Sequence, residues 1–352
     1  MKENKKRSFP WRLLFNIGIV LLTVFLIIFF VFSKDGIVDL ARNHVEIIAG
    51  WIAAAVAIHL LNIFLDSYII YLFTKHSCPE FTLGQAIKVG LTGQFYCAVT
   101  PGASGGQPMQ ILAFSRMGID PGSGTSALIQ KFLVWQFTLC AYCIVAVAAK
   151  FGFLSQFMNP AMWVLSIAGF AAQVGMIAVL MLASFNQALT TKIAYFFCDL
   201  GGKIRLIKDV ECKKRKISEV LASFHDNNKQ MTGNAPLMIR AYVVTFVQMT
   251  AYFLVPYCIS RAFGVRYGVF DMLCAEAFVS MVSGLVPLPG ASGVTEYCFS
   301  VFFSAYFLPQ TMKSAILIWR TVTYYGTILL TAPFAGLKKK RQNADTENAE
   351  VT

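Results

Sequence analysis

A string of five residues that favours close approach of the backbone to a ligand occurs twice in this chain. Pro-Gly-Ala-Ser-Gly spans 101–105 and again 289–293. Glycine lets the main chain come close to a bound group, and the free N–H groups at the start of a following helix favour an anion such as phosphate. The serine of each copy adds a hydroxyl donor. The repeat therefore predicts two matching half-sites for an anionic group.

The residues that we expect to bind the anion lie in the two strings and directly beside them. They are Pro101, Gly102, Ser104, Gly105, Gly106 and Gln107 at the first half-site, and Pro287, Pro289, Gly290, Ser292, Gly293 and Glu296 at the second. The sequence shows no zinc or iron-sulfur spacing, no nucleotide-binding loop and no recognisable pair of nucleophile and base. We therefore expect no metal, no cofactor and no catalytic residue.

One cation follows each string within the next apolar segment. Lys131 comes thirty residues after Pro101, and Arg320 comes thirty-one after Pro289. Charges at membrane depth are costly, so such residues are candidates for function. Arg320 would bind a lipid phosphate through its fork, and Lys131 would act as a point charge. The alternative is that both side chains reach out to the membrane interface.

Three carboxylates inside apolar segments are candidates for coupling transport to an ion: Asp66, Glu276 and Glu296. Glu296 follows the second string, where it would balance Arg320, bind an amine-bearing headgroup or titrate during transport. Asp66 shares a helical face with His59, which fits a cavity wall or a proton relay. The alternative for Asp66 is a solvated position near the end of its span.

The composition is that of an integral membrane protein. Hydrophobic residues make up 57% of the chain, 31 residues are phenylalanine and only 14% are charged, which excludes a single soluble core. The net charge of +12 comes from short basic runs beside apolar segments, as the positive-inside rule explains. We therefore expect no nucleic acid partner. The nine cysteines show no paired spacing outside the membrane, so we expect no disulfide framework.

The apolar pattern predicts an all-α polytopic membrane protein with about six full spans and two re-entrant helical hairpins. The hairpins cover 83–117 and 270–307, where the strings interrupt pieces too short to cross a bilayer. When the basic runs are placed on the cytoplasmic side of the membrane, the two hairpins enter it from opposite faces. This arrangement is an inverted repeat of the kind found in secondary transporters. The alternative is that Gly and Pro only kink two ordinary helices. The spans are 13–32, 47–73, 125–149, 161–185, 237–259 and 315–334.

The domain organisation follows from the same pattern. Residues 1–12 form a basic cytoplasmic N-terminus, 13–337 a single transmembrane domain, and 338–352 a disordered cytoplasmic tail. Within the domain, 186–236 holds nine Lys or Arg and predicts a cytoplasmic amphipathic pair of helices that attracts anionic lipids. We expect a multi-pass protein of the cell membrane with both termini in the cytoplasm.

Two longer stretches resemble a known family. TPGASGGQPMQILAFSRMGI followed by SALIQK, and PLPGASGVTE followed by AILIWR, are similar to the flippase-like membrane domain of lysylphosphatidylglycerol synthases. The second stretch places Glu296 and Arg320 on positions of the family pattern. The first departs from it, because Gln107 and Pro108 stand where many members carry charged residues.

The resemblance implies a lipid translocator for an anionic or aminoacylated phospholipid such as lysyl-phosphatidylglycerol. In two-domain members a separate soluble domain transfers lysine from lysyl-tRNA, and we expect no such activity from this chain alone. The partners implied are membrane phospholipids and a separate aminoacyltransferase or glycosyltransferase. Two alternatives stay open: a lipid-modification component that acts with a soluble partner, and an ion-coupled transporter of small molecules.

Overall fold

The protein is built from helices, as the apolar pattern predicts. The computed structural model describes residues 47–157, 160–203, 209–284 and 288–336, and within these ranges every regular element is a helix. The predicted span 13–32, the terminal segments 1–12 and 338–352, and Pro287 lie outside the described residues.

Four helices in the described ranges are long and apolar enough to cross a membrane. They include the predicted span 47–73, which begins two residues later and runs four residues further, to Ser77. The predicted span 237–259 is broken at Leu254, shortly before Pro256, a residue that lacks an N–H for helix bonding. The helices are α3 (Ala49–Ser77), α6 (Pro121–Leu154), α7 (Pro160–Phe185) and α10 (Ala235–Phe253) with its continuation α11 (Val255–Ala262).

The predicted last span, 315–334, is interrupted by a π-helical turn. The N–H of Gly326 donates to the carbonyl of Thr321, five residues earlier. A Cβ atom on residue 326 would lie 2.9 Å from that oxygen, so glycine fits this wide turn. Such turns are frequent at functional sites. The segment consists of α14 (Pro309–Arg320), the π turn η4 (Thr321–Tyr325), α15 (Gly326–Thr331) and a short 3₁₀ turn, η5 (Ala332–Phe334).

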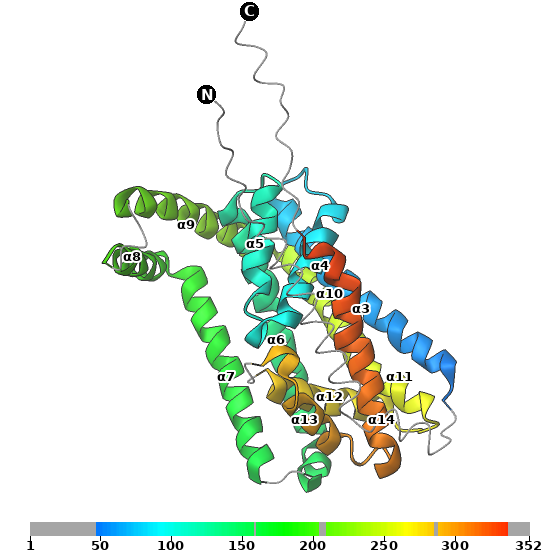
Figure 1. Ribbon diagram of the computed structural model, residues 1–352. Coiled ribbons are helices and arrows are strands. Elements are labelled where there is room, and N and C mark those ends of the chain that lie inside the picture. The colour runs from blue at the N-terminus through cyan, green and yellow to red at the C-terminus, as the bar shows by residue number, and fades with distance from the viewer. Residues whose placement is uncertain (1–46, 158–159, 204–208, 285–287, 337–352) are drawn as a thin grey trace, which may run out of the picture.

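Each repeated string forms the tip of a helical hairpin. The first hairpin is α4 (Leu83–Val99), the tip η1 (Pro101–Ala103) and α5 (Gly106–Arg116). The second is α12 (Val269–Ser283), the tip η3 (Pro289–Ala291) and α13 (Val294–Phe302). The two hairpins lie toward opposite ends of the molecule (Figure 1), and the tips η1 and η3 contact each other. That the hairpins re-enter from opposite membrane faces stays a prediction.

An aromatic cluster fixes the second hairpin against α14. The rings of Phe299 and Phe303 stack with centroids 4.2 Å apart, and Phe299 lies 4.6 Å from Trp319. All three side chains are buried. Offset aromatic pairs add about 0.5–1.5 kcal/mol beyond their burial. This packing places Arg320, the next residue after Trp319, beside the second tip.

The basic segment forms two helices that extend from one end of the bundle, α8 (Gln187–Lys203) and α9 (Val210–Gly233) (Figure 1). Lys214 and Asp199 join them through an ion pair of 2.7 Å, and the hydrogen bond to Asp199 raises the pKa of Lys214. Asp120, just before α6, accepts hydrogen bonds from Ser223 of α9 and from Ser123. Burial alone would raise the pKa of Asp120, but these donors together lower it.

The helix α8 exposes apolar side chains, and its neighbour α9 exposes basic side chains. Such a combination is typical of helices that lie at a membrane interface. The apolar ones are Ile193, Phe196, Phe197 and Leu200, and the basic ones include Lys213, Arg215 and Lys216. That this surface faces the cytoplasm stays a prediction.

Candidate functional site

The two tips begin with the same unusual backbone conformation. Gly102 and Gly290 both have a left-handed conformation, with φ of 58° and 59°. The alanines that follow, Ala103 and Ala291, also have positive φ, 55° and 48°. A left-handed alanine costs about 1–2 kcal/mol, and strain of this kind often occurs at functional sites. The repeated string thus folds twice into the same strained turn.

The tips diverge after the alanine. Ser104 continues in a helical conformation with ψ of −21°, whereas Ser292 is extended with ψ of 140°. The next glycine differs as well, because φ is −81° at Gly105 and 92° at Gly293. The same five residues therefore follow two paths into the second arms of their hairpins.

The residues around each string explain this divergence. In the first tip, the Gly105 N–H donates to the Thr100 hydroxyl over 2.9 Å. In the second, the Gly293 N–H donates to a carboxylate oxygen of Glu296 over 2.5 Å. Pro108 occupies the position in the first copy that Glu296 has in the second. The first tip thus lacks the carboxylate that reshapes the second.

Arg320 binds the second tip from α14. Its terminal nitrogen donates to the carbonyl of Gly290 at 2.8 Å and to the hydroxyl of Ser292 at 3.1 Å. Its Nε lies 3.2 Å from Glu296, and both side chains are only 6% exposed. The guanidinium also lies over the ring of Tyr324, 4.5 Å from its centroid. In this arrangement Arg320 is an internal clamp on the tip and does not reach out to an interface.

Tyr324 connects the two hairpins, although no motif in the sequence marks it. Its hydroxyl donates to the carbonyl of Ala98 in α4 over 3.0 Å. Its ring packs so closely on the second tip that a Cβ atom on Gly290 would lie 2.3 Å from a ring carbon. The signal that points to it is its spacing, because it follows Arg320 by four residues on a helix.

The other candidate cation is paired away from its tip. The Nζ of Lys131 lies 2.7 Å from the Asp66 carboxylate, and Gln248 donates to the same carboxylate over 3.3 Å. Within the described ranges, no hydrogen bond or ion pair joins Lys131 to the first tip. Asp66 is 6% exposed, so the alternative of a solvated side chain is wrong. The reason is the extension of α3 to Ser77, which places Asp66 more than two turns inside the helix.

The three carboxylates proposed for coupling differ in their partners. Glu296 pairs with Arg320, and Asp66 pairs with Lys131. Glu276, in the middle of α12, is 1% exposed, and neither of its carboxyl oxygens has a hydrogen-bond partner among the described residues. It is therefore the one of the three without a counterion in direct contact.

The first tip is the more open of the two. Its residues 101–104 are exposed, and Gly105 is half-buried. Gly106, which begins α5, is buried against the other arm. The corresponding residues of η3 are half-buried, because Arg320 and Tyr324 cover them. The exposed predicted residues of the first tip are Pro101, Gly102, Ser104 and Gln107.

The arms of the first hairpin pack through glycine. A Cβ atom on Gly106 would lie 2.1 Å from the sulfur of Cys97, and one on Gly93 would lie 2.2 Å from the amide nitrogen of Gln110. Small residues at such contacts let membrane helices approach closely. Gly106, proposed as a binding residue, thus also sets the distance between α4 and α5.

Replacing Gly106 by alanine is expected to destabilise the protein by about 1–3 kcal/mol, the usual cost of an extra methyl group in a packed core. The combination with Cys97→Ala, which removes the sulfur, should recover part of the loss. Thermal unfolding of the purified protein in detergent measures both effects. Gly84→Ala is the matched control, because nothing lies within 4 Å of its added Cβ atom. Equal melting temperatures for Gly106→Ala and Gly84→Ala would contradict the close packing.

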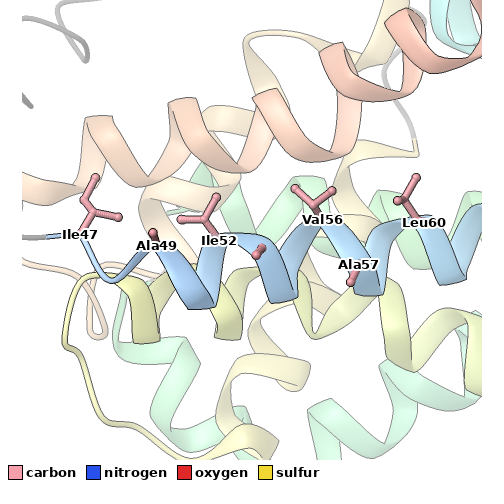
Figure 2. Close-up of a pocket in the computed structure, with 7 residues that line it drawn as sticks. Ile47, Ala49, Ile52, Val56, Ala57 and Leu60 are labelled. Atoms are coloured by element: carbon pink, nitrogen blue, oxygen red, sulfur yellow. The ribbon is translucent and has the colours of Figure 1, made fainter.

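A hollow lies away from the tips, along α3. It has a volume of about 640 Å³, and Figure 2 shows the residues that line it, from Ile47 to Leu60. A second groove of about 570 Å³ lies between α3 and the α14–α15 segment, with His59 among its apolar residues. His59 is buried, and its Nε2 lies 2.7 Å from the Thr327 hydroxyl. These surfaces are apolar, as expected where helices face lipid.

Nearly the whole chain is similar to known proteins. A family model described as the lysylphosphatidylglycerol synthase TM region matches residues 14–331. A UPF0104 membrane protein of Archaeoglobus fulgidus is 24% identical over 257 residues, which are 70% of this chain and 74% of that protein. The family match contains both tips, together with Lys131 and Arg320.

Proposed function

We propose that this chain, which belongs to the lysylphosphatidylglycerol synthase transmembrane-region family, moves a phospholipid between the leaflets of the cell membrane. The cargo that we propose is an anionic or aminoacylated phospholipid such as lysyl-phosphatidylglycerol. The observation that carries the proposal is the contact between two strained tips whose hairpins lie toward opposite ends of the molecule (Figure 1). Irregular backbone at membrane depth occurs where protein or a water-filled cavity surrounds it.

The chemistry at the junction of the tips suits a phosphate. The exposed first tip offers the hydroxyl of Ser104 and the amide side chain of Gln107, beside the start of α5. Arg320 holds the second tip through single hydrogen bonds to Gly290 and Ser292. A phosphate oxygen accepts the arginine fork more strongly than these neutral oxygens do. We infer that an arriving headgroup competes with the tip for Arg320 and so loosens the clamp.

The basic surface of α8 and α9 supports an anionic cargo. A basic side chain near an anionic membrane surface contributes about 1 kcal/mol of attraction. Lys213, Arg215 and Lys216 are exposed on α9. These side chains would concentrate anionic lipid at the end of the bundle that we predict to face the cytoplasm.

A leaflet-resolved assay in proteoliposomes tests the proposal. The purified chain is reconstituted with labelled phosphatidylglycerol, its lysyl ester or phosphatidylcholine, and the label in the outer leaflet is followed over time. We expect the protein to accelerate the movement of at least one of the first two lipids over empty vesicles, and to move phosphatidylcholine less. Movement no faster than in empty vesicles for all three lipids would contradict the proposal.

The same vesicles separate the alternative functions. Incorporation of labelled lysine into lipid, with lysyl-tRNA and a soluble aminoacyltransferase as the proposed partner, would favour a role in lipid modification. Uptake of a small solute without lipid movement would favour an ion-coupled transporter. The proposed topology, with both termini in the cytoplasm, is tested by labelling cysteines introduced near each terminus from either side of the membrane.

A further inference from the structure

Glu276 is the most isolated buried charge-bearing group in the described part of the chain. It lies in the middle of α12, is 1% exposed and makes no hydrogen bond through either carboxyl oxygen to the residues that the structure describes. Burying an ionised carboxylate without a partner costs several kcal/mol or more. The buried carboxylates Glu296 and Asp66 both have a cation in direct contact. Glu276 has none.

The charged and titratable groups around Glu276 come from several helices. Arg320 of α14, Tyr252 of α10 and Cys298 of α13 all lie close enough to interact with it electrostatically. Glu296, also on α13, acts on the same cysteine. Arg320 is thus the cation that both glutamates share.

Among the residues that the structure describes, Arg320 is the cation that acts on Glu276, and the cations Lys150 and Arg261, on other helices packed against α12, have partners elsewhere. On α6, Lys150 pairs with Asp271, more than one turn before Glu276, at 2.6 Å. Also on α6, Cys143 donates to the carbonyl of Ala277. On α11, Arg261 lies over the ring of Trp51, 5.3 Å from its centroid, and Cys258 belongs to the same apolar core as α12. The helix α7 contains no titratable side chain. With both carboxylates ionised, the net charge of Glu276, Glu296 and Arg320 is therefore −1. One bound proton makes this group neutral.

We propose that Glu276 is a proton-binding site that controls the clamp on the second tip. With Glu276 protonated, Arg320 stays with Glu296 and holds the tip through Gly290 and Ser292. When Glu276 releases its proton to water, its carboxylate competes with Glu296 for Arg320. Arg320 then leaves Gly290 and Ser292, and the tip loosens. Binding of a proton from the other side of the membrane restores the clamp.

The energy source of the proposed lipid movement is then a proton gradient, and for that cargo the proton coupling rests on the proposed function. Its physical basis is independent of the cargo, because the three side chains and the tip belong to this chain. A proton gradient would then drive the opening and closing of the tip in one direction. The isosteric variant Glu276→Gln stays neutral at every pH and should keep the tip clamped.

Infrared spectroscopy tests the protonation of Glu276 directly. Purified protein at neutral pH should show the carbonyl stretch of a protonated carboxyl group, and this band should be missing in Glu276→Gln. Glu80→Gln, at an exposed position between α3 and α4, is the matched control and should keep the band. The same spectrum for wild type and Glu276→Gln would overturn the assignment of the proton to Glu276.

Hydrogen exchange of the tip tests the coupling without any cargo. As the pH rises, the exchange of the segment 288–296, corrected for the intrinsic rate, should increase about tenfold in wild type, a typical size for coupling between two sites. It should stay constant in Glu276→Gln. The same pH dependence in both proteins would overturn the control of the clamp by Glu276.

Proteoliposomes with an imposed pH gradient then separate this inference from the proposed function. We expect wild type to move lipid faster with the gradient than without it, and Glu276→Gln to show no such difference. An equal rate of lipid movement by wild type with and without the gradient would refute the proton coupling, but it would still support lipid translocation. No lipid movement at all would refute the proposed function, and the exchange experiment would still decide the role of Glu276.

Discussion

Replacing Arg320 by alanine is expected to destabilise the protein by about 3–5 kcal/mol, the usual cost of breaking a buried ion pair by removing one partner. The variant leaves the Glu296 carboxylate buried without its cation and removes the hydrogen bonds to Gly290 and Ser292. Thermal unfolding in detergent measures the loss. Arg320→Lys should be intermediate, because lysine keeps the charge but lacks the fork that reaches Glu296 and the tip together.

Two further variants separate the ion pair from a general loss of packing. Arg320→Met combined with Glu296→Gln should recover part of the stability, because it removes both charges and keeps the volume. Arg266→Ala, at an exposed position before α12, is the matched control and should unfold like wild type. A melting temperature of Arg320→Ala equal to that of this control would show that Arg320 does not clamp the tip.

Replacing Gly290 by alanine is expected to cost about 2–5 kcal/mol, the sum of left-handed strain and of overpacking. The strain arises because φ is 59° at this residue. The overpacking arises because the added Cβ atom would lie 2.3 Å from the ring of Tyr324. Since Tyr324 also contacts Ala98, the variant should separate the two hairpins and abolish lipid movement in the leaflet-resolved assay.

The matched control for this variant is Gly118→Ala. Gly118 has a φ of 81°, and nothing lies within 4 Å of its added Cβ atom. It should therefore show only the backbone strain of about 1–2 kcal/mol. Combining Gly290→Ala with Tyr324→Leu, which removes the ring edge, should recover stability. Equal losses for Gly290→Ala and Gly118→Ala would contradict the close contact between Tyr324 and the tip.

The sequence was sufficient to predict the helical membrane fold and the positions of the tips. Long apolar segments predicted α3, α6, α7 and α10, and the glycine and proline clusters predicted the breaks between the hairpin arms. These signals are local, because they depend on hydrophobic length and on residues that cannot continue a helix. The ion pair between Glu296 and Arg320 was among the alternatives, because opposite charges at membrane depth tend to pair.

The partners of the other charges depend on contacts that are distant in the chain. Similar spacing after the two strings suggested that Lys131 and Arg320 both bind a phosphate, but Asp66 from α3 pairs with Lys131, whereas Arg320 binds its tip. Identical strings also took different paths, because Glu296 binds Gly293 in one copy and Pro108 offers no carboxylate in the other. Tyr324 carried no motif. Its role depends on which helices pack together.

The central claim is that an anionic phospholipid occupies the junction of the two tips. Photo-crosslinking tests it most directly, with a phosphatidylglycerol that carries the reactive group near its headgroup and with mass spectrometry to locate the adducts. We predict adducts on 101–107 and on 288–296, and fewer of them in Arg320→Lys. Adducts confined to α3, around the apolar hollow of Figure 2, would contradict the claim.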